Sequence, residues 1–434
     1  MSEATPVAAT ERFVSLDMLR GVAVLGILVM NIYAFAMPFA AYSNPLMMGG
    51  TDALNLGTWF FTHVFFDQKF ISIFAMMFGA GIVLMSGRAE ARGANPAPIY
   101  YRRQFWLVII GMLHGYFIWM GDILFGYAVI GMIVYLFRRQ NPRTLIVIAC
   151  LLLPVTPILN YGMSNLMDEL RTEALAIEVL QAAGEEISEE QQETLDEWRE
   201  SRVMMAPTPE DTQKDLEANR GSYSDIFEYR VPIVASMQVF MVIFYGLWRI
   251  GGMMLIGMAL MKLGVLTGER SAVFYRKLML AGYIIGLPIM VFSAYDLHQH
   301  QYDGIYGMRF GYIANYVGSI AMALGHIGLV MLAAKSGWFK TLMARFAAAG
   351  RMALTNYLMH SFILTTVFYG YGLGLYGRVP RFSQMAFVAA VLSLQLWLSP
   401  WWLQRYRFGP VEWLWRSISY WRRQPMRREQ AVSR

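Results

Sequence analysis

Residues 111–128 read GMLHGYFIWMGDILFGYA, an apolar stretch that contains one histidine and one aspartate. On membrane-insertion scales an acidic side chain near the bilayer centre costs roughly 2.5 to 3.5 kcal/mol. Ionisable groups inside such segments are therefore usually retained for binding or chemistry. We expect His114 and Asp122 to belong to a functional site within a membrane.

The composition of the whole chain supports a membrane location. Of 434 residues, 56% are hydrophobic and only 15% are charged, and the mean hydropathy is +0.40. Spans need roughly 15 to 25 apolar residues, and about ten stretches qualify: 21–37, 56–86, 105–120, 123–137, 144–163, 231–261, 278–295, 309–334, 352–371 and 383–403. The second is long enough to be tilted, kinked or broken near Asp67 and Lys69. We predict an all-α, polytopic integral membrane protein with about ten transmembrane helices.

The distribution of lysine and arginine predicts the orientation of these helices. The loops on the same side as the two termini, together with the terminal segments, carry 25 Lys and Arg residues. The loops on the opposite side carry six in 164–230, plus Arg378 and Arg381. Cytoplasmic loops hold the excess of basic residues in membrane proteins. We therefore expect a multi-pass protein of the cell (plasma or inner) membrane with both termini in the cytoplasm.

One segment differs from the rest of the chain. Residues 164–230 contain 18 of the 30 Asp and Glu residues but six Lys and Arg, a local net charge of −12. Runs such as EEISEEQQETLDEWRESR have a helical composition, and Gly184 and the turn-like sequence APTP at 206–209 bound them. We interpret 164–230 as an acidic, helical, extracytoplasmic insertion between a first five-helix half, 1–163, and a second, 231–403, followed by a basic cytoplasmic tail, 404–434.

Helical phase and predicted depth sort the polar residues into two groups. His114, Asp122, Asn31, His63 and Asp67 fall in the middle or outer half of their spans, where they can converge on a chamber. Arg102, Arg103, Arg249, Lys262 and Arg351 belong to the cytoplasmic half and predict a basic inner mouth. A large anionic molecule from the cytosol would suit this polarity.

Signatures of familiar soluble enzymes and metal sites are missing. The sequence has no Walker loop, HExxH, CxxC, nucleophile elbow or dinucleotide fingerprint. The single cysteine, Cys150, excludes an intramolecular disulfide. We find no set of metal ligands, and metal dependence stays open. We predict no bound cofactor and no nucleic-acid partner, with membrane lipids as neighbours; the oligomeric state does not follow from the sequence.

Five blocks of the chain resemble one known family. They are SLDMLRGVAVLGILVMN at 15–31, FFDQKFISIFAMMFGAG at 65–81, GMLHGYFIWMGDILFGYAVIG at 111–131, GRMALTNYLMHS at 350–361 and FGPVEWLWRSISY at 408–420. These blocks resemble the YeiB-like membrane proteins, which carry a domain of unknown function (DUF418). That family is more remotely similar to transmembrane acyltransferases, including heparan-glucosaminide N-acetyltransferase and the O-acyltransferases of bacterial surface sugars.

The resemblance implies an activity and a set of site residues. Related acyltransferases take an acyl group from cytosolic acyl-CoA and deliver it to a hydroxyl or amine at the outer face, using an intramembrane histidine. The matched blocks then point to Arg20, Asn31, Asp67, Lys69, His114, Asp122, Asn356, Glu412 and Arg416. His360 occupies a position where a glutamine is expected in many relatives.

These residues lead to a mechanistic hypothesis with acyl-CoA as co-substrate and a small molecule or glycan as acceptor. His114 would act as the general base, Asp122 or Asp67 would orient it, and Asn31 would donate to the developing oxyanion. The donor would be held by Lys69, Arg102, Arg103 and Arg249, with Arg20, Asn356, His360, Glu412 and Arg416 as further substrate-binding candidates.

Two alternatives stay open at this level. A transporter or flippase would use the intramembrane His, Asp and Arg groups as a relay, and five spans on each side of the insertion suit the inverted halves of many carriers. His114 and His326 occupy corresponding positions in those halves. An assembly or scaffold protein would leave the buried charges without an evident purpose.

Overall fold

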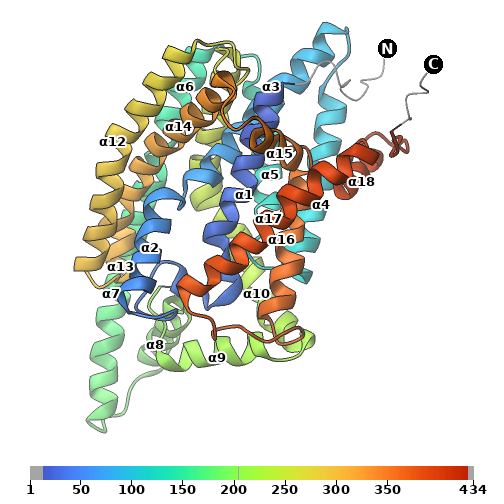
Figure 1. Ribbon diagram of the computed structural model, residues 1–434. Coiled ribbons are helices and arrows are strands. Elements are labelled where there is room, and N and C mark those ends of the chain that lie inside the picture. The colour runs from blue at the N-terminus through green and yellow to red at the C-terminus, as the bar shows by residue number, and fades with distance from the viewer. Residues whose placement is uncertain (1–12, 204, 429–434) are drawn as a thin grey trace, which may run out of the picture.

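The computed structural model describes residues 13–203 and 205–428, and this part of the chain is helical almost throughout. Its long helices lie roughly along a common axis and form a bundle (Figure 1). Residues 1–12 and 429–434, which the topology prediction also assigns to the cytoplasm, lie outside the described residues. The all-α prediction is confirmed.

Seven helical segments of the described chain are long and apolar enough to cross a membrane. They comprise α1 (Val14–Ala36), α2 with α3 (Ala53–Phe65 and Lys69–Ala91), α6 with α7 (Pro142–Leu152 and Val155–Ala182), α10 to α11 (Tyr223–Phe240, the π-helical η4 Met241–Ile250, and Gly251–Lys262), α12 (Ala272–Gln299), α13 to α14 (Gly304–Tyr306, η5 Gly307–Gly311 and Tyr312–Ser336), and α17 (Arg381–Arg405). The protein is therefore a polytopic helical protein of the membrane type.

The remaining predicted spans are helices as well, but shorter or more polar. They correspond to α4 (Ala97–Phe117), α5 (Leu124–Val134, continued by η3 Tyr135–Phe137) and α16 (Ala353–Phe368). Between the spans lie the short η2 (Phe39–Tyr42), α15 (Lys340–Arg351) and, after the last span, α18 (Pro410–Ser419).

The second apolar stretch is broken where the sequence indicated. Helix α2 ends at Phe65 and α3 begins at Lys69, with Gln68 in the left-handed region at φ 64°. This interruption leaves Asp67 outside both helices. Its carboxylate can therefore accept hydrogen bonds from neighbouring helices.

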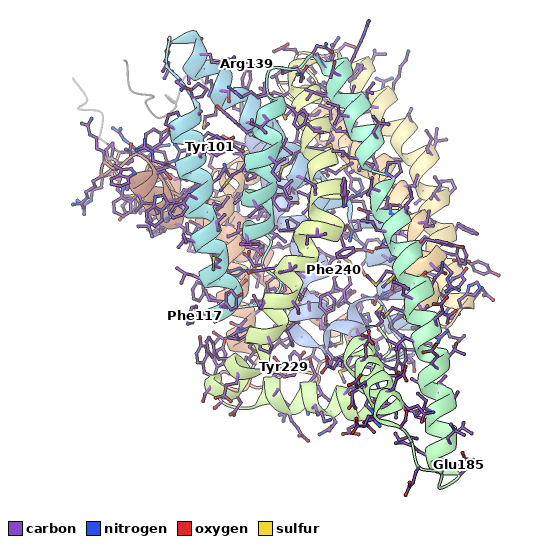
Figure 2. All side chains as sticks on the ribbon, turned by 180° about the vertical axis from the view of Figure 1, so that it is seen from behind. Tyr101, Phe117, Arg139, Glu185, Tyr229 and Phe240 are labelled. Carbon is purple, nitrogen blue, oxygen red and sulfur yellow. The ribbon has the colours of Figure 1, made fainter. Side chains whose placement is uncertain are left out.

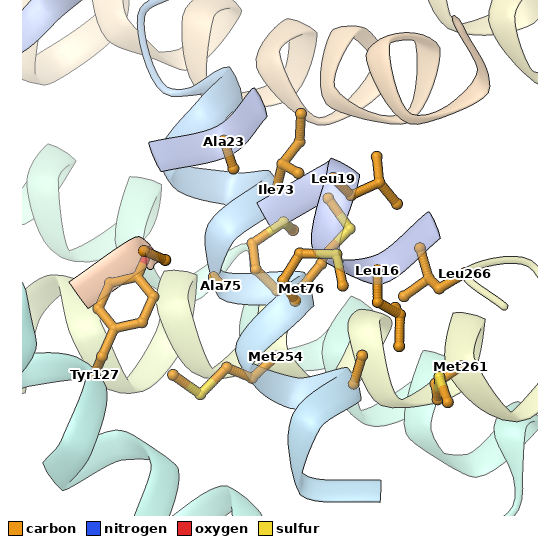
Figure 3. Close-up of a cluster of buried hydrophobic side chains, with 14 of the residues drawn as sticks. Leu16, Leu19, Ala23, Ile73, Ala75, Met76, Tyr127, Met254, Met261 and Leu266 are labelled. Carbon is orange, nitrogen blue, oxygen red and sulfur yellow. The ribbon is translucent and has the colours of Figure 1, made fainter. Parts of the chain in front are cut away.

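The main core lies where α1, α3 and α11 meet. Leu16 and Leu19 of α1, Met76 of α3 and Met254 of α11 belong to one buried cluster, shown in Figure 3. Two glycines allow this contact. A Cβ added at Gly79 would lie 1.9 Å from the Met254 carbonyl oxygen, and a Cβ added at Gly257 would lie 1.9 Å from the Met76 carbonyl oxygen. Small residues at helix crossings of this kind permit close backbone packing in membranes. Because α3 and α11 come from opposite sides of the acidic insertion, both parts of the chain share this core.

The acidic segment forms helices at one end of the bundle. Helix α8 (Glu189–Arg202) packs against α7 through Leu195 and Trp198, and α9 (Pro209–Arg220) follows it. The labelled residues Glu185 and Arg139 lie at opposite ends of the molecule (Figure 2). The bundle thus has one strongly acidic end and one end rich in arginine.

A half-buried carboxylate links helix α9 to the loop between α16 and α17. Asp215 accepts hydrogen bonds from the Tyr376 hydroxyl at 2.7 Å and the Tyr229 hydroxyl at 3.0 Å. The Arg220 guanidinium donates to the Tyr376 carbonyl at 2.8 Å. Burial raises the pKa of the Asp215 carboxyl above its ordinary value, although these hydrogen bonds oppose the rise.

Candidate functional site

The site is built around His114, near the end of α4, whose side chain is 1% exposed. Its Nδ1 lies 2.8 Å from Asp122 Oδ1, and its Nε2 lies 2.8 Å from Ser361 Oγ on α16. A carboxylate oxygen can only accept, so Nδ1 carries the proton and donates it to Asp122. When Nε2 carries no proton, it accepts a hydrogen bond from the Ser361 hydroxyl. The geometry is that of a hydroxyl, an imidazole and a carboxylate in series.

A break between α4 and α5 brings Asp122 back to His114. Residues 118–123 are not helical, and the carbonyls at the end of α4 need partners outside the helix. The Phe117 carbonyl accepts the Tyr223 hydroxyl at 2.8 Å, and the Arg230 guanidinium donates to the carbonyls of Phe117 and Ile118. These hydrogen bonds give the carbonyls of Phe117 and Ile118 the partners that they need where the chain leaves the helix.

Gly111 makes this reversal possible. It lies on α4 one turn before His114, where an added Cβ would meet the Phe125 backbone nitrogen at 2.4 Å and Asp122 Oδ2 at 2.9 Å. Asp122 Oδ2 accepts the Phe125 N–H at 2.8 Å. The absence of a side chain at Gly111 thus lets both Asp122 oxygens reach their donors.

Ser361 was not among the residues predicted from the sequence. It ends the block GRMALTNYLMHS and is fully buried on α16. It is also one helical turn after Tyr357, whose ring centroid lies 5.2 Å from that of His114. The sequence does place the Ser361 hydroxyl on the same helix face as Tyr357. Its hydrogen-bond partner, however, is 247 residues away in the chain, and no local pattern identifies that partner.

A cavity of about 290 Å³ opens toward the arginine-rich end of the bundle. Its apolar wall includes Phe74, Phe78, Leu107, Leu124 and Tyr127, whereas its charged lining contains six arginines and two acids: Arg20, Arg88, Arg103, Arg351, Arg407, Arg416, Asp17 and Glu412. Cations thus outnumber anions at the mouth. An anionic head with a less polar arm is the kind of molecule that suits such a lining.

The C-terminal helix α18 completes this cavity. Glu412 accepts hydrogen bonds from the Thr355 backbone N–H at 3.0 Å and the Thr355 hydroxyl at 2.5 Å. Trp415 donates from its indole nitrogen to the Arg103 carbonyl at 2.9 Å, and the Arg103 guanidinium lies 4.4 Å from the Trp415 ring centroid. The C-terminal segment, which the sequence predicts as a basic tail with Glu412 and Arg416 as substrate-binding candidates, therefore forms part of the cavity wall.

Tyr357 separates the cavity from the His114 centre. Its side chain lines the cavity, its hydroxyl donates to the Gly121 carbonyl at 3.2 Å, and it accepts the Ile123 N–H at 3.2 Å. Arg103 at the mouth precedes His114 by eleven residues on α4, which corresponds to roughly 16 Å along a helix. The cavity thus leads from the arginines to the residue that covers the histidine.

Asp67 belongs to a different buried cluster. It accepts hydrogen bonds from Asn315 at 2.6 Å and Tyr42 at 3.1 Å, and its Oδ2 lies 3.4 Å from His63 Nδ1. The Lys69 ammonium donates to the His63 carbonyl at 2.6 Å. Of the two carboxylates proposed to orient His114, the structure therefore brings only Asp122 to it.

Some of the other candidates line the cavity, and some lie outside both the cavity lining and the Asp67 cluster. Arg20, which pairs with Asp17 at 3.1 Å, lines the cavity with Arg103, Glu412 and Arg416. Arg249 is buried and donates to the Tyr316 carbonyl and to Ser72 and Ser319, outside the cavity lining, while Arg102 is exposed. Asn31 is half-buried on α1.

Two candidates on α16 bond to α17 instead of to the cavity. Asn356 donates to Ser399 at 3.1 Å, and His360 Nε2 lies 2.8 Å from Gln395 Oε1. The Asn356 carbonyl in turn accepts from Gln395 at 2.9 Å. These contacts hold the two helices together and thereby fix the rotation of α16 that points Ser361 at His114.

Comparisons with known proteins give a family but no activity. The model of the family described as "Protein of unknown function (DUF418)" matches residues 260–422. The chain is 30% identical to the uncharacterized protein YxaH of Bacillus subtilis (strain 168), over the full length of both. It is 32% identical to the uncharacterized protein YeiB of Escherichia coli (strain K12), over 94% of this chain and 96% of that one.

Proposed function

Because the chain belongs to the DUF418 family, and because a basic cavity leads toward a buried histidine and carboxylate, we propose that it is a transmembrane acyltransferase. It moves an acyl group from a cytosolic acyl-CoA-type donor to a small-molecule or glycan acceptor at the outer side of the cell membrane. The resemblance to transmembrane acyltransferases supports the reaction type at the level of a superfamily.

In this proposal the chain crosses the membrane ten times, with α4, α5 and α16 as the spans beyond the seven long ones. Both termini are cytoplasmic, and the helices α8 and α9 of the acidic insertion are extracytoplasmic. The excess of basic residues in the loops at one end of the bundle supports this orientation. The cavity mouth then faces the cytosol, where acyl-CoA is found.

The single observation that carries the proposal is the placement of the cavity relative to His114. The arginines at its mouth suit the phosphates of a CoA-type donor, and its apolar wall suits the acyl chain and thioester. A pantetheine arm has about the reach of five residues of extended chain, roughly 17 Å. This length matches the distance along α4 between Arg103 and His114.

The chemistry proposed for His114 is general acid–base catalysis. Unprotonated Nε2 takes a proton as an oxygen nucleophile attacks the thioester carbonyl, and it returns a proton to the leaving sulfur. Asp122 holds Nδ1–H and stabilises the imidazolium that forms between these transfers.

The experiment that tests the proposal measures acyl-CoA binding and free-thiol release by the purified full chain. We expect saturable binding of acetyl-CoA or a longer acyl-CoA, with thiol release that is lost in His114→Ala. The matched control is His326→Gln, since His326 bonds the Tyr283 hydroxyl and the Phe65 carbonyl instead. Absence of binding at high acyl-CoA concentration, or full thiol release by His114→Ala, contradicts the proposal.

A transporter or flippase is the second candidate, and the Asp67 cluster favours it. Asp67, His63 and Lys69 form a buried ionisable network that acyl transfer does not use. Such networks serve as proton or substrate relays in carriers. In reconstituted vesicles this function predicts uptake driven by a pH gradient, without acylated product, and loss of that uptake in Asp67→Asn.

A further inference from the structure

We propose that Ser361 carries the acyl group as an oxygen ester, so that transfer proceeds in two steps through an acyl-enzyme. This inference rests on the acyltransferase function proposed above and adds the residue that is acylated. Ser361 is not among the candidates that the sequence predicts, and no relative assigns it a role.

The first support is the hydrogen-bond geometry. Ser361 Oγ donates to His114 Nε2 at 2.8 Å, and His114 Nδ1 donates to Asp122 Oδ1 at 2.8 Å. A serine hydroxyl becomes nucleophilic when an adjacent base, itself oriented by a third group, removes its proton. Both bonds lie within the usual 2.6–3.2 Å for a nucleophile and its base. Asp122 is fixed in turn by the Phe125 N–H at 2.8 Å.

The second support is the position of Ser361 along α16. The helix runs from Ala353, which lines the cavity, to Phe368. Ser361 lies near its midpoint, one turn beyond Tyr357. A donor from the cytosol and an acceptor from the outer side would otherwise have to meet at one buried point at one time. A covalent intermediate on Ser361 removes this requirement, because each substrate can react in turn.

Acyl transfer through Ser361 takes place in two steps. In the first, Ser361 Oγ bonds to the thioester carbonyl carbon and the carbon–sulfur bond breaks; the Oγ proton passes to His114 Nε2 and then to the leaving sulfur, which departs as a free thiol. In the second, an acceptor hydroxyl or amine loses its proton to Nε2 and bonds to the acyl carbon. The ester bond to Ser361 breaks, and the proton returns to Oγ.

The experiment uses the purified full chain with acetyl-CoA and no acceptor. We expect a rapid release of one equivalent of free thiol per protein, and an intact mass increased by one acetyl group, mapped to the peptide that contains Ser361. Ser361→Ala is expected to lose both signals. The control is Thr365→Val, which removes a buried hydroxyl one turn away on the same helix and is expected to keep both.

A second variant separates a nucleophile from a residue that only positions His114. In a Cys150→Ala background, Ser361→Cys retains an attacking atom and is expected to form a thioester, which neutral hydroxylamine cleaves readily, unlike the ester of wild type. A positioning role predicts no adduct in either protein.

The outcomes distinguish this inference from the function on which it rests. Thiol release in Ser361→Ala at the wild-type rate, or an adduct on another residue, overturns the role of Ser361 and leaves the acyltransferase standing. Absence of both acetyl-CoA binding and thiol release in wild type overturns the acyltransferase and the acyl-serine together.

Discussion

Replacing Asp122 by asparagine tests the electrostatic logic of the site without changing its shape. In wild type Asp122 accepts from two donors, His114 Nδ1–H and the Phe125 N–H, both at 2.8 Å. An amide has one acceptor oxygen and one donor nitrogen. If the oxygen keeps the Phe125 N–H, the amide nitrogen faces Nδ1 and shifts the proton of His114 to Nε2, which points at Ser361.

The expected decrease in rate follows from the loss of the hydrogen bond between His114 and the Asp122 carboxylate. A hydrogen bond to a charged group is worth about 1.5–3 kcal/mol, or about 10- to 150-fold in rate at 1.4 kcal/mol per tenfold. The wrong tautomer adds to this loss, and the same replacement beside the histidine of a serine protease lowers kcat by about 10⁴-fold. We therefore expect Asp122→Asn to lower kcat for thiol release by about 10²- to 10⁴-fold.

The assay is thiol release from acetyl-CoA by the purified variant, with thermal unfolding measured in parallel. KM is expected to change little, because Asp122 does not line the donor cavity. A folded Asp122→Asn protein that keeps wild-type kcat would refute the assignment of Asp122 as the orienting group.

Three further predictions concern the packing, the cavity and the acidic end. Gly111→Ala is expected to destabilise the protein by about 1–3 kcal/mol by overpacking and to lower thiol release. The control Gly57→Ala, where nothing lies within 4 Å of the added Cβ, is expected to do neither. Equal melting temperatures for the two variants would contradict this prediction. Arg103→Ala is expected to weaken acetyl-CoA binding by about tenfold, equivalent to about 1.4 kcal/mol. The same variant is expected to bind acetyl-pantetheine as well as wild type does, because this ligand lacks the nucleotide phosphates. An equal loss of affinity for both ligands would disprove the phosphate contact. Burial raises the pKa of the Asp215 carboxyl above 3.8, so its contribution to stability is fully present below pH 3.8 and is lost as the pH rises through the folded-state pKa. The melting temperature of the wild-type protein is therefore expected to fall over that pH window relative to the melting temperature of Asp215→Asn. A rise would show that the sign of this contribution is wrong.

The site was only partly predictable, and the reason differs from residue to residue. His114 and Asp122 stood out because charge in an apolar stretch is costly and therefore informative. Asp67 stood out equally, and nothing local distinguishes a carboxylate that bonds His114 from one that bonds Asn315 and Tyr42. Arg249 was predicted near a basic mouth, yet it bonds Tyr316, Ser72 and Ser319.

The sequence alone determined the helical class, the apolar segments, the acidic segment and the break near Asp67. These features are local, because a helix satisfies its backbone hydrogen bonds within itself and its hydropathy can be read residue by residue. The tertiary structure decided which polar groups meet: Ser361 reaches His114 across 247 residues, and α18 closes a cavity that begins at α1. Such partnerships depend on the rotation and crossing of packed helices, to which residues from the whole chain contribute.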